Sequence, residues 1–138
     1  MDTKSNRELE LEKVELSISA MEDEIVEVQK YVKAAKYLAE LECDEGYQFV
    51  VEQMFIAEES DRLTGFLVGD QHLSDDDVKA INDGLKSIRA FKALITNTKQ
   101  AAIEAPARLA RIRARIAEEN MFKADVMAGN VDVGDSDE

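Results

Sequence analysis

Apolar residues recur at alternating steps of three and four along the first third of the chain. They are Leu11, Val14, Ile18, Met21, Ile25, Val28, Val32 and Ala35. This repeat over four heptads is typical of a long helix that buries a narrow apolar stripe against another helix. We therefore predict a helix over about residues 5–41 with Ser5 as its N-cap. The positions from Leu11 to Val32 are named the docking seam below.

A second helical pattern covers residues 47–68. It follows a break at residues 43–46, where Gly46 is the expected helix terminus or hinge. The β-branched run Phe49-Val50-Val51 is also compatible with a short strand, but no partner strand is visible elsewhere in the sequence. We therefore predict a helix for the whole segment.

The next helix is predicted from a capping box, in which Ser74 is followed three residues later by Asp77. This helix should cover about residues 75–104. Pro106 should then produce a kink or a short break, because proline removes an intrahelical hydrogen bond and disfavours helical geometry in the preceding residue. A last helix over about residues 107–120 continues the apolar stripe.

These elements predict one all-α domain, an elongated helical bundle with an antiparallel coiled-coil stalk. The stalk is a helical hairpin. The predicted domain spans residues 1–122, with stalk helices at 5–41 and 107–120 and core helices at 47–68 and 75–104. Residues 123–138 contain little to bury and should form an acidic, mobile tail.

The net charge of −13 is unevenly distributed along the chain. Residues 1–78 carry 21 acids and 7 bases (net −14), whereas residues 79–117 carry 9 bases and 2 acids (net +7). The acids that flank the docking seam would repel each other across a parallel homodimer, so the basic helix is the better partner. Exposed ion pairs contribute only ~0–1 kcal/mol each. Charge should therefore select the orientation, while apolar burial holds the stalk together.

Catalytic and metal-binding chemistry find little support in the sequence. His72 is the sole histidine and lies in a polar loop, and Cys43, the sole cysteine, should be a half-buried structural thiol. The residues for a zinc site or for paired Glu-x-x-His motifs are missing. The run of aspartates that ends at Asp77 is better explained as a helix start than as a calcium loop, because Lys79 occupies a ligand position. We expect no enzyme, no cofactor and no metal.

Targeting features are also missing from the sequence. No apolar run reaches the ~20 residues that cross a bilayer, and the first residues lack the apolar stretch of a secretion signal. A single cysteine fits a reducing cytosol. We therefore expect no membrane partner.

Four arginines have assignable roles as charge-pairing or partner-contact residues. Arg108, Arg111 and Arg115 share one face of a helix, which would suit phosphate contact. No aromatic residues are interleaved with them and the rest of the chain is acidic, so we expect them to contact protein rather than nucleic acid. Arg62, on an apolar helix, should pair with a glutamate one turn away, Glu58 or Glu59.

A spacing of apolar and charged residues over more than half of the chain is similar to that of a known family. It comprises Ala35–Leu41, Tyr47-Gln48-Phe49-Val50-Val51, Phe55, Glu58-Glu59, Arg62-Leu63, then Ile81, Leu85, Ile88 and Phe91, and an Ala/Arg-rich final helix. In these features the chain resembles a family of small helical proteins of the virion-morphogenesis type, encoded by tailed bacteriophages. It departs from that family at Gly65-Phe66, at Pro106 and in its long acidic tail.

The resemblance implies a non-enzymatic structural or assembly component of a tailed-phage particle: a minor capsid, connector or scaffold-type protein that acts by helix docking. Its location would be the virion or the host cytoplasm. The expected partners are other protein subunits, either copies of this chain in a homo-oligomer or capsid or connector proteins. One alternative is an acidic inhibitor that mimics nucleic acid and blocks a host DNA-binding enzyme. Another is an oligomeric, chaperone-like coiled coil.

Overall fold

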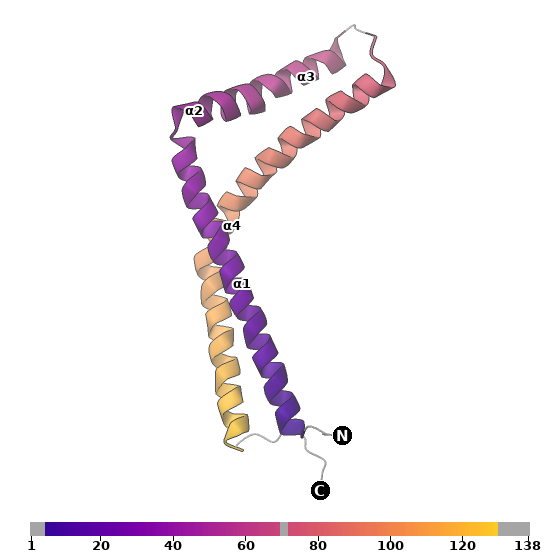
Figure 1. Ribbon diagram of the computed structural model, residues 1–138. Helices are drawn as coiled ribbons and strands as arrows, with labels where there is room; N and C mark the ends of the chain where they lie inside the picture. The colour runs from indigo at the N-terminus through magenta and orange to yellow at the C-terminus, as the bar shows by residue number, and fades with distance from the viewer. Residues whose placement is uncertain (1–4, 70–71, 130–138) are drawn as a thin grey trace. The chain divides into compact units, whose positions relative to one another are not determined.

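The computed structural model describes residues 5–69 and 72–129, and every regular element within them is helical. The elements, labelled in Figure 1 where there is room, are α1 (Asn6–Glu42), α2 (Glu45–Tyr47), the π-helix η1 (Gln48–Glu58), α3 (Glu59–Val68) and α4 (Asp75–Met127). Parts of α1 and α4 run antiparallel and pack against each other. The prediction of an all-α fold with an antiparallel helical hairpin is confirmed.

Two predicted helix starts are confirmed by their hydrogen bonds. At the start of α1, the Glu8 backbone N–H donates to Ser5 Oγ at 3.2 Å. At the start of α4, the Asp77 N–H donates to Ser74 Oγ at 3.1 Å, and the Ser74 N–H donates to Asp77 Oδ2 at 3.4 Å. Each cap satisfies backbone donors that the first helical turn leaves without a partner.

The break after α1 differs from the prediction. Asp44, rather than Gly46, organises it, because Asp44 Oδ1 accepts a hydrogen bond from the Tyr47 N–H at 2.9 Å and so caps α2. Gly46 lies inside α2 and terminates nothing. The carboxylate satisfies the free N–H of the new helix, so the chain enters that helix directly and no glycine terminus is needed.

Residues 47–68 are helical throughout, which confirms a helix over a strand, but the segment is not one α-helix. Its first half, η1, has the wider hydrogen bonding of a π-helix, shown where the Glu59 N–H donates to the carbonyl of Met54 five residues back. This change of period alters which side chains share a face.

The break or kink predicted at Pro106 does not divide α4, which is a continuous helix from Asp75 to Met127. Proline costs one intrahelical hydrogen bond. The surrounding residues Ala101, Ala102, Ala105 and Ala107 are strong helix formers. Ala105 is also buried in an apolar cluster, so packing stabilises the helical conformation where the proline disfavours it.

The end of α4 also lies later than predicted. The helix was expected to stop near residue 120 and a tail to begin at residue 123, but α4 continues to Met127 and buries Val126. Gly129, at φ 77°, then ends the helix in the left-handed region that favours glycine. The remainder of the predicted tail, residues 130–138, lies outside the described residues.

The chain divides into two compact units, and both boundaries fall within long helices. Unit 1 consists of Met1–Lys30 and Ile103–Glu138, and unit 2 consists of Tyr31–Ala102. Unit 1 has a core at the interface of α1 and α4. The buried core of unit 2 is Leu63, Ile81, Leu85 and Ile88, with Phe66 and Leu73 packed against it.

Candidate docking surfaces

The docking seam is used inside the chain over most of its length. In unit 1, Val14, Met21 and Val28 are buried, and Leu11, Ile18 and Ile25 are half-buried. The α4 residues that contact the seam are Ala105, Leu109, Ile112 and Ile116. Val32, the last seam position, belongs to unit 2 and is exposed. The buried part of the seam therefore ends at Val28.

Two ion pairs join α1 and α4 across their antiparallel contact in unit 1. Arg108 Nη2 lies 2.9 Å from Glu24 Oε1, and Lys123 Nζ lies 3.2 Å from Glu15 Oε1. Arg111 is exposed and makes no ion pair within residues 5–69 and 72–129. The same holds for exposed Arg115 in that part of the chain. Of the three arginines assigned to one face, the structure therefore pairs only Arg108 with the acidic helix.

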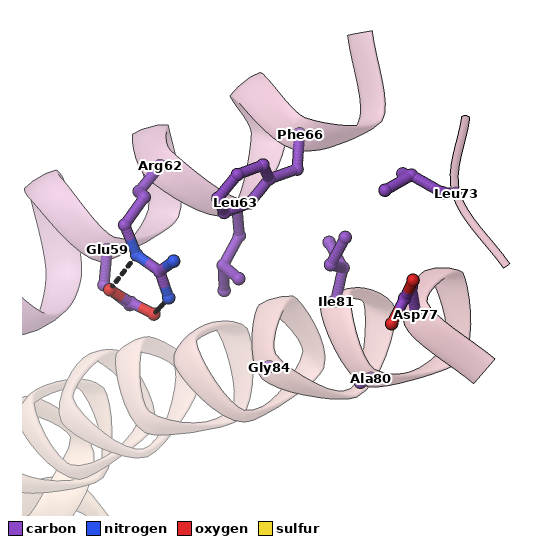
Figure 2. A pocket seen from close by; sticks show the side chains of 9 residues that line it. All are labelled: Glu59, Arg62, Leu63, Phe66, Leu73, Asp77, Ala80, Ile81 and Gly84. Carbon is purple, nitrogen blue, oxygen red and sulfur yellow. Dashed lines mark hydrogen bonds and ion pairs between the residues drawn. The ribbon is translucent and has the colours of Figure 1, made fainter. Parts of the chain in front are cut away.

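Arg62 pairs with Glu59, one of its two predicted partners. Arg62 Nε donates to Glu59 Oε2 at 2.9 Å, Nη2 donates to Oε1, and the guanidinium carbon lies 5.3 Å from the centre of the Phe66 ring (Figure 2). The hydrogen bonds from Arg62 lower the pKa of the Glu59 carboxyl, and the same pairing raises the pKa of Arg62. Both contacts are within unit 2, so this arginine is already engaged by its own helix.

The Arg62–Glu59 pair stands at the edge of a pocket of about 500 Å³ between α3 and the start of α4. In Figure 2 the Leu63 side chain points from α3 towards Gly84 on α4. A Cβ at Gly84 would lie 2.9 Å from Leu63 Cδ1, closer than carbon atoms normally approach. The glycine therefore lets the two helices come together beside the pocket.

A second hollow in unit 2 is lined almost entirely by apolar side chains. We name this groove of about 440 Å³ the apolar groove; its lining residues are Ala34, Tyr37, Leu38, Leu41, Tyr47, Phe91, Leu94, Ile95 and Thr98. Tyr37 and Leu94 remain 53% and 60% exposed. Apolar side chains that gather in an open groove are typical of an interaction site.

One end of unit 2 carries a polar cluster next to this groove. Lys99 Nζ lies 2.8 Å from Glu42 Oε1 and donates a hydrogen bond to Oε2 at 2.9 Å. The Gln48 side chain donates to the Glu42 backbone carbonyl at 2.6 Å. Burial, followed by the carboxylates of Glu52 and Glu42, raises the pKa of the Tyr47 phenol. These contacts hold the end of α1 to α4 and to the start of η1.

The π-helix carries the second apolar surface of unit 2. Phe49 and Met54, five residues apart, are both exposed, and Val50 beside Phe49 is exposed as well. Val51 and Ile56, also five apart, are half-buried. A π-helix is wider than an α-helix and turns less per residue, so residues five apart lie closer to one face than they would in an α-helix. Reading the segment with the α-helical period therefore missed the separation between half-buried Val51 and Ile56 and the exposed residues Phe49, Val50 and Met54, which are named the outer line of η1 below.

Other kinds of site are not evident in the described part of the chain. Residues 5–69 and 72–129 contain no group of three or more His, Cys, Asp or Glu side chains that could hold a metal ion. Among the same residues, no helix has the length and apolar character needed to cross a membrane. Cys43 is exposed, so the expectation of a half-buried thiol is wrong: it lies in the short turn before the Asp44 cap, away from either core.

Comparison with known proteins gives no family for this chain. No protein-family model, curated protein or solved structure matches it. Its function is therefore inferred from the surfaces described above.

Proposed function

We propose that this chain is a non-enzymatic structural or assembly component of a tailed-phage particle, acting by helix-mediated docking to other protein subunits. The tailed-phage context rests on the residue spacing from Tyr47 to about Glu119 that resembles the virion-morphogenesis family. The docking mode rests on the surfaces of unit 2.

The observation that carries the proposal is the contrast between the two units. Unit 1 covers its seam with its own α4, whereas unit 2 leaves the apolar groove open and the outer line of η1 exposed. Burying apolar surface contributes roughly 25 cal/mol per Å². Large side chains such as Phe49 and Leu94 therefore favour association with another protein surface over continued contact with water.

Mass spectrometry of purified particles from the phage that encodes the chain tests this proposal. We expect the chain in mature particles or in assembly intermediates, and we expect an amount that scales with particle number, because a docking subunit acts stoichiometrically. Removing its reading frame should lower the yield of complete particles, and supplying the chain in trans should restore it. Normal particle yield without the chain, together with its absence from particles and intermediates, would contradict the proposal.

The rival function is an acidic inhibitor that mimics nucleic acid. The net charge of −13 favours it. Against it, Glu15 and Glu24 on the acidic helix are engaged by Lys123 and Arg108, which reduces the charge that this face could offer to a DNA-binding enzyme. If the rival is right, the chain should be captured by a host DNA-binding enzyme and be displaced by duplex DNA.

Direct nucleic-acid binding is tested with the three arginines of α4. We expect no measurable duplex-DNA complex of the isolated protein, and none after Arg108, Arg111 and Arg115 are all replaced by glutamine. A complex whose affinity falls steeply with salt, and which the triple substitution abolishes, would show that these side chains contact phosphates.

A further inference from the structure

Unit 1 carries a second heptad repeat on α4, on the face turned away from α1. Its positions follow alternating steps of four and three over three heptads: Ile103, Ala107, Ala110, Ala114, Ala117, Met121 and Ala124. All seven are exposed. Ile112, which packs against α1, lies about 200° around the helix from Ala110 and Ala114. We name the seven positions the outer seam of α4.

We infer that the outer seam pairs α4 with the α4 of a second copy of this chain, in a parallel two-fold coiled coil. The inference goes beyond the proposed function, because the docking proposed above uses the surfaces of unit 2 and this contact lies in unit 1. Either contact can therefore exist without the other.

The first argument is the strict separation of apolar and polar positions on a face that the chain itself leaves open. Between residues 103 and 124, every exposed position outside the outer seam is a charged residue, Pro106 or Asn120. Within the seam, Ile103 and Met121 are large apolar side chains that remain 73% and 69% exposed. The alanines between them would let two helix axes approach closely. An apolar line bordered by charge is the pattern that a helix presents to another helix.

The second argument is the charge beside the seam, which favours a second copy in parallel orientation. In a parallel coiled coil, Arg113 on one edge of the seam would face Glu118 of the second copy on the other edge. Two-fold symmetry forms this contact twice, and no edge pair then joins like charges. An antiparallel pair would bring Arg111 beside Glu118 but also Glu104 beside Asp125, so that repulsion offsets attraction. One helix thus carries both halves of the parallel ion pair.

Neither half of that ion pair is already used inside the chain. Arg113 and Glu118 are both exposed, and neither makes an ion pair within residues 5–69 and 72–129. Lys13 of α1 lines a hollow together with Glu118, but its Nζ lies 3.5 Å from Glu10 Oε1 and pairs with that acid instead. The edges of the outer seam therefore keep a base and an acid for a partner helix.

Light scattering of the full chain tests the pairing directly. We expect twice the monomer mass of 15.4 kDa, falling to the monomer mass on dilution. Ala114→Lys, in the middle of the seam, would set two ammonium groups against each other and should give a monomer. Ala20→Lys is the matched control, because Ala20 is also an exposed alanine of unit 1 but lies on α1. It should remain dimeric. Circular dichroism confirms that both variants are folded. A wild-type monomer at every concentration would overturn the inference, and so would a folded Ala114→Lys variant that stays dimeric.

Charge reversal tests the orientation. Arg113→Glu should weaken the dimer at least tenfold, because Glu118 of the second copy would then face a like charge. Adding Glu118→Arg to the same chain should restore it. Arg111→Glu makes the same change in net charge two residues away and should leave the dimer unchanged. The opposite result, loss with Arg111→Glu and none with Arg113→Glu, would show an antiparallel pair and contradict the parallel assignment.

Disulfide trapping tests the register without a change of charge. Cys43 is the sole cysteine, so Cys43→Ser gives a background in which single cysteines can be placed. In the parallel pair Ala107→Cys faces its own copy and should form a cross-linked homodimer in higher yield than Ala20→Cys. In an antiparallel pair the two cysteines at position 107 would lie about 25 Å apart, at ~1.5 Å of rise per residue. Equal yields from the two variants would contradict the assigned contact.

These outcomes are distinguishable from those for the proposed function. A monomeric chain that is nevertheless present in particles would overturn self-pairing and leave the assembly role standing. A dimer that pairs through the outer seam but is absent from particles and intermediates would support this inference and remove the phage role.

Discussion

The same substitution at two nearby positions of α1 should destabilise the protein at one position and not at the other. Val28 is 2% exposed and packs in the unit 1 cluster with Met21, Ala105 and Ile112, whereas Val26 is 64% exposed. Val28→Ala removes two buried methyl groups, which costs about 1.6 kcal/mol at ~0.8 kcal/mol per buried carbon. The cavity adds about 1 kcal/mol, and the better helix propensity of alanine returns roughly 0.5 kcal/mol. The net loss should be about 2 kcal/mol.

Val26→Ala is the matched control, because it makes the same change in propensity on the same helix without opening a cavity. It should leave the free energy of unfolding unchanged or raise it by roughly 0.5 kcal/mol. Urea unfolding followed by far-ultraviolet circular dichroism measures both variants. The unfolding free energy should fall with urea concentration at the same rate in both, so that the midpoints can be compared. Equal shifts for the two variants would refute the burial of Val28 and with it the internal use of the seam.

Three further predictions concern caps, charge and pH. Ser74→Ala removes the side-chain acceptor that caps α4 and should lower the free energy of unfolding by about 1 kcal/mol in urea unfolding. Arg108→Gln breaks the pair with Glu24 and should cost up to ~1 kcal/mol, less at high salt, whereas Arg111→Gln should have no measurable effect. Burial raises the pKa of the Tyr47 phenol, so the neutral form is favoured in the folded state. Stability from this group is present below the ordinary tyrosine pKa of about 10 and is lost as the pH rises through the raised value. Tyr47→Phe should therefore reduce the alkaline loss of stability, measured as unfolding midpoints between about pH 9 and 11.

The parts of the fold that could be predicted from the sequence are those fixed by local chemistry or by a long periodic pattern. The heptads from Leu11 to Val28 repeat often enough to specify a helix and its apolar side. Ser5 and Ser74 act through hydrogen bonds to residues only three positions away, so their capping role is visible in the sequence. The pairing of Arg62 with a glutamate one turn away has the same local origin.

The parts that could not be predicted depend on packing or on an unusual helical period. The continuity of α4 through Pro106 depends on the burial of Ala105 against α1, a contact between residues distant in sequence. The extension of α4 to Met127 likewise depends on burying Val126. The outer line of η1 could not be recognised with a period of 3.6 residues, because the π-helix turns less per residue than an α-helix.

The candidate docking surfaces illustrate a more general limit of periodic patterns. A heptad repeat shows that one side of a helix is apolar, but it does not show what covers that side. The seam pattern continues without change from Val28 to Val32, although only Val28 is buried. The difference arises because burial requires an opposing surface, which the α4 residues around Ala105 supply in unit 1. In unit 2 the apolar positions Tyr37 and Leu94 have no such cover within residues 5–69 and 72–129. Apolar positions left open by the chain's own packing are therefore the places where contact with another subunit is most favourable.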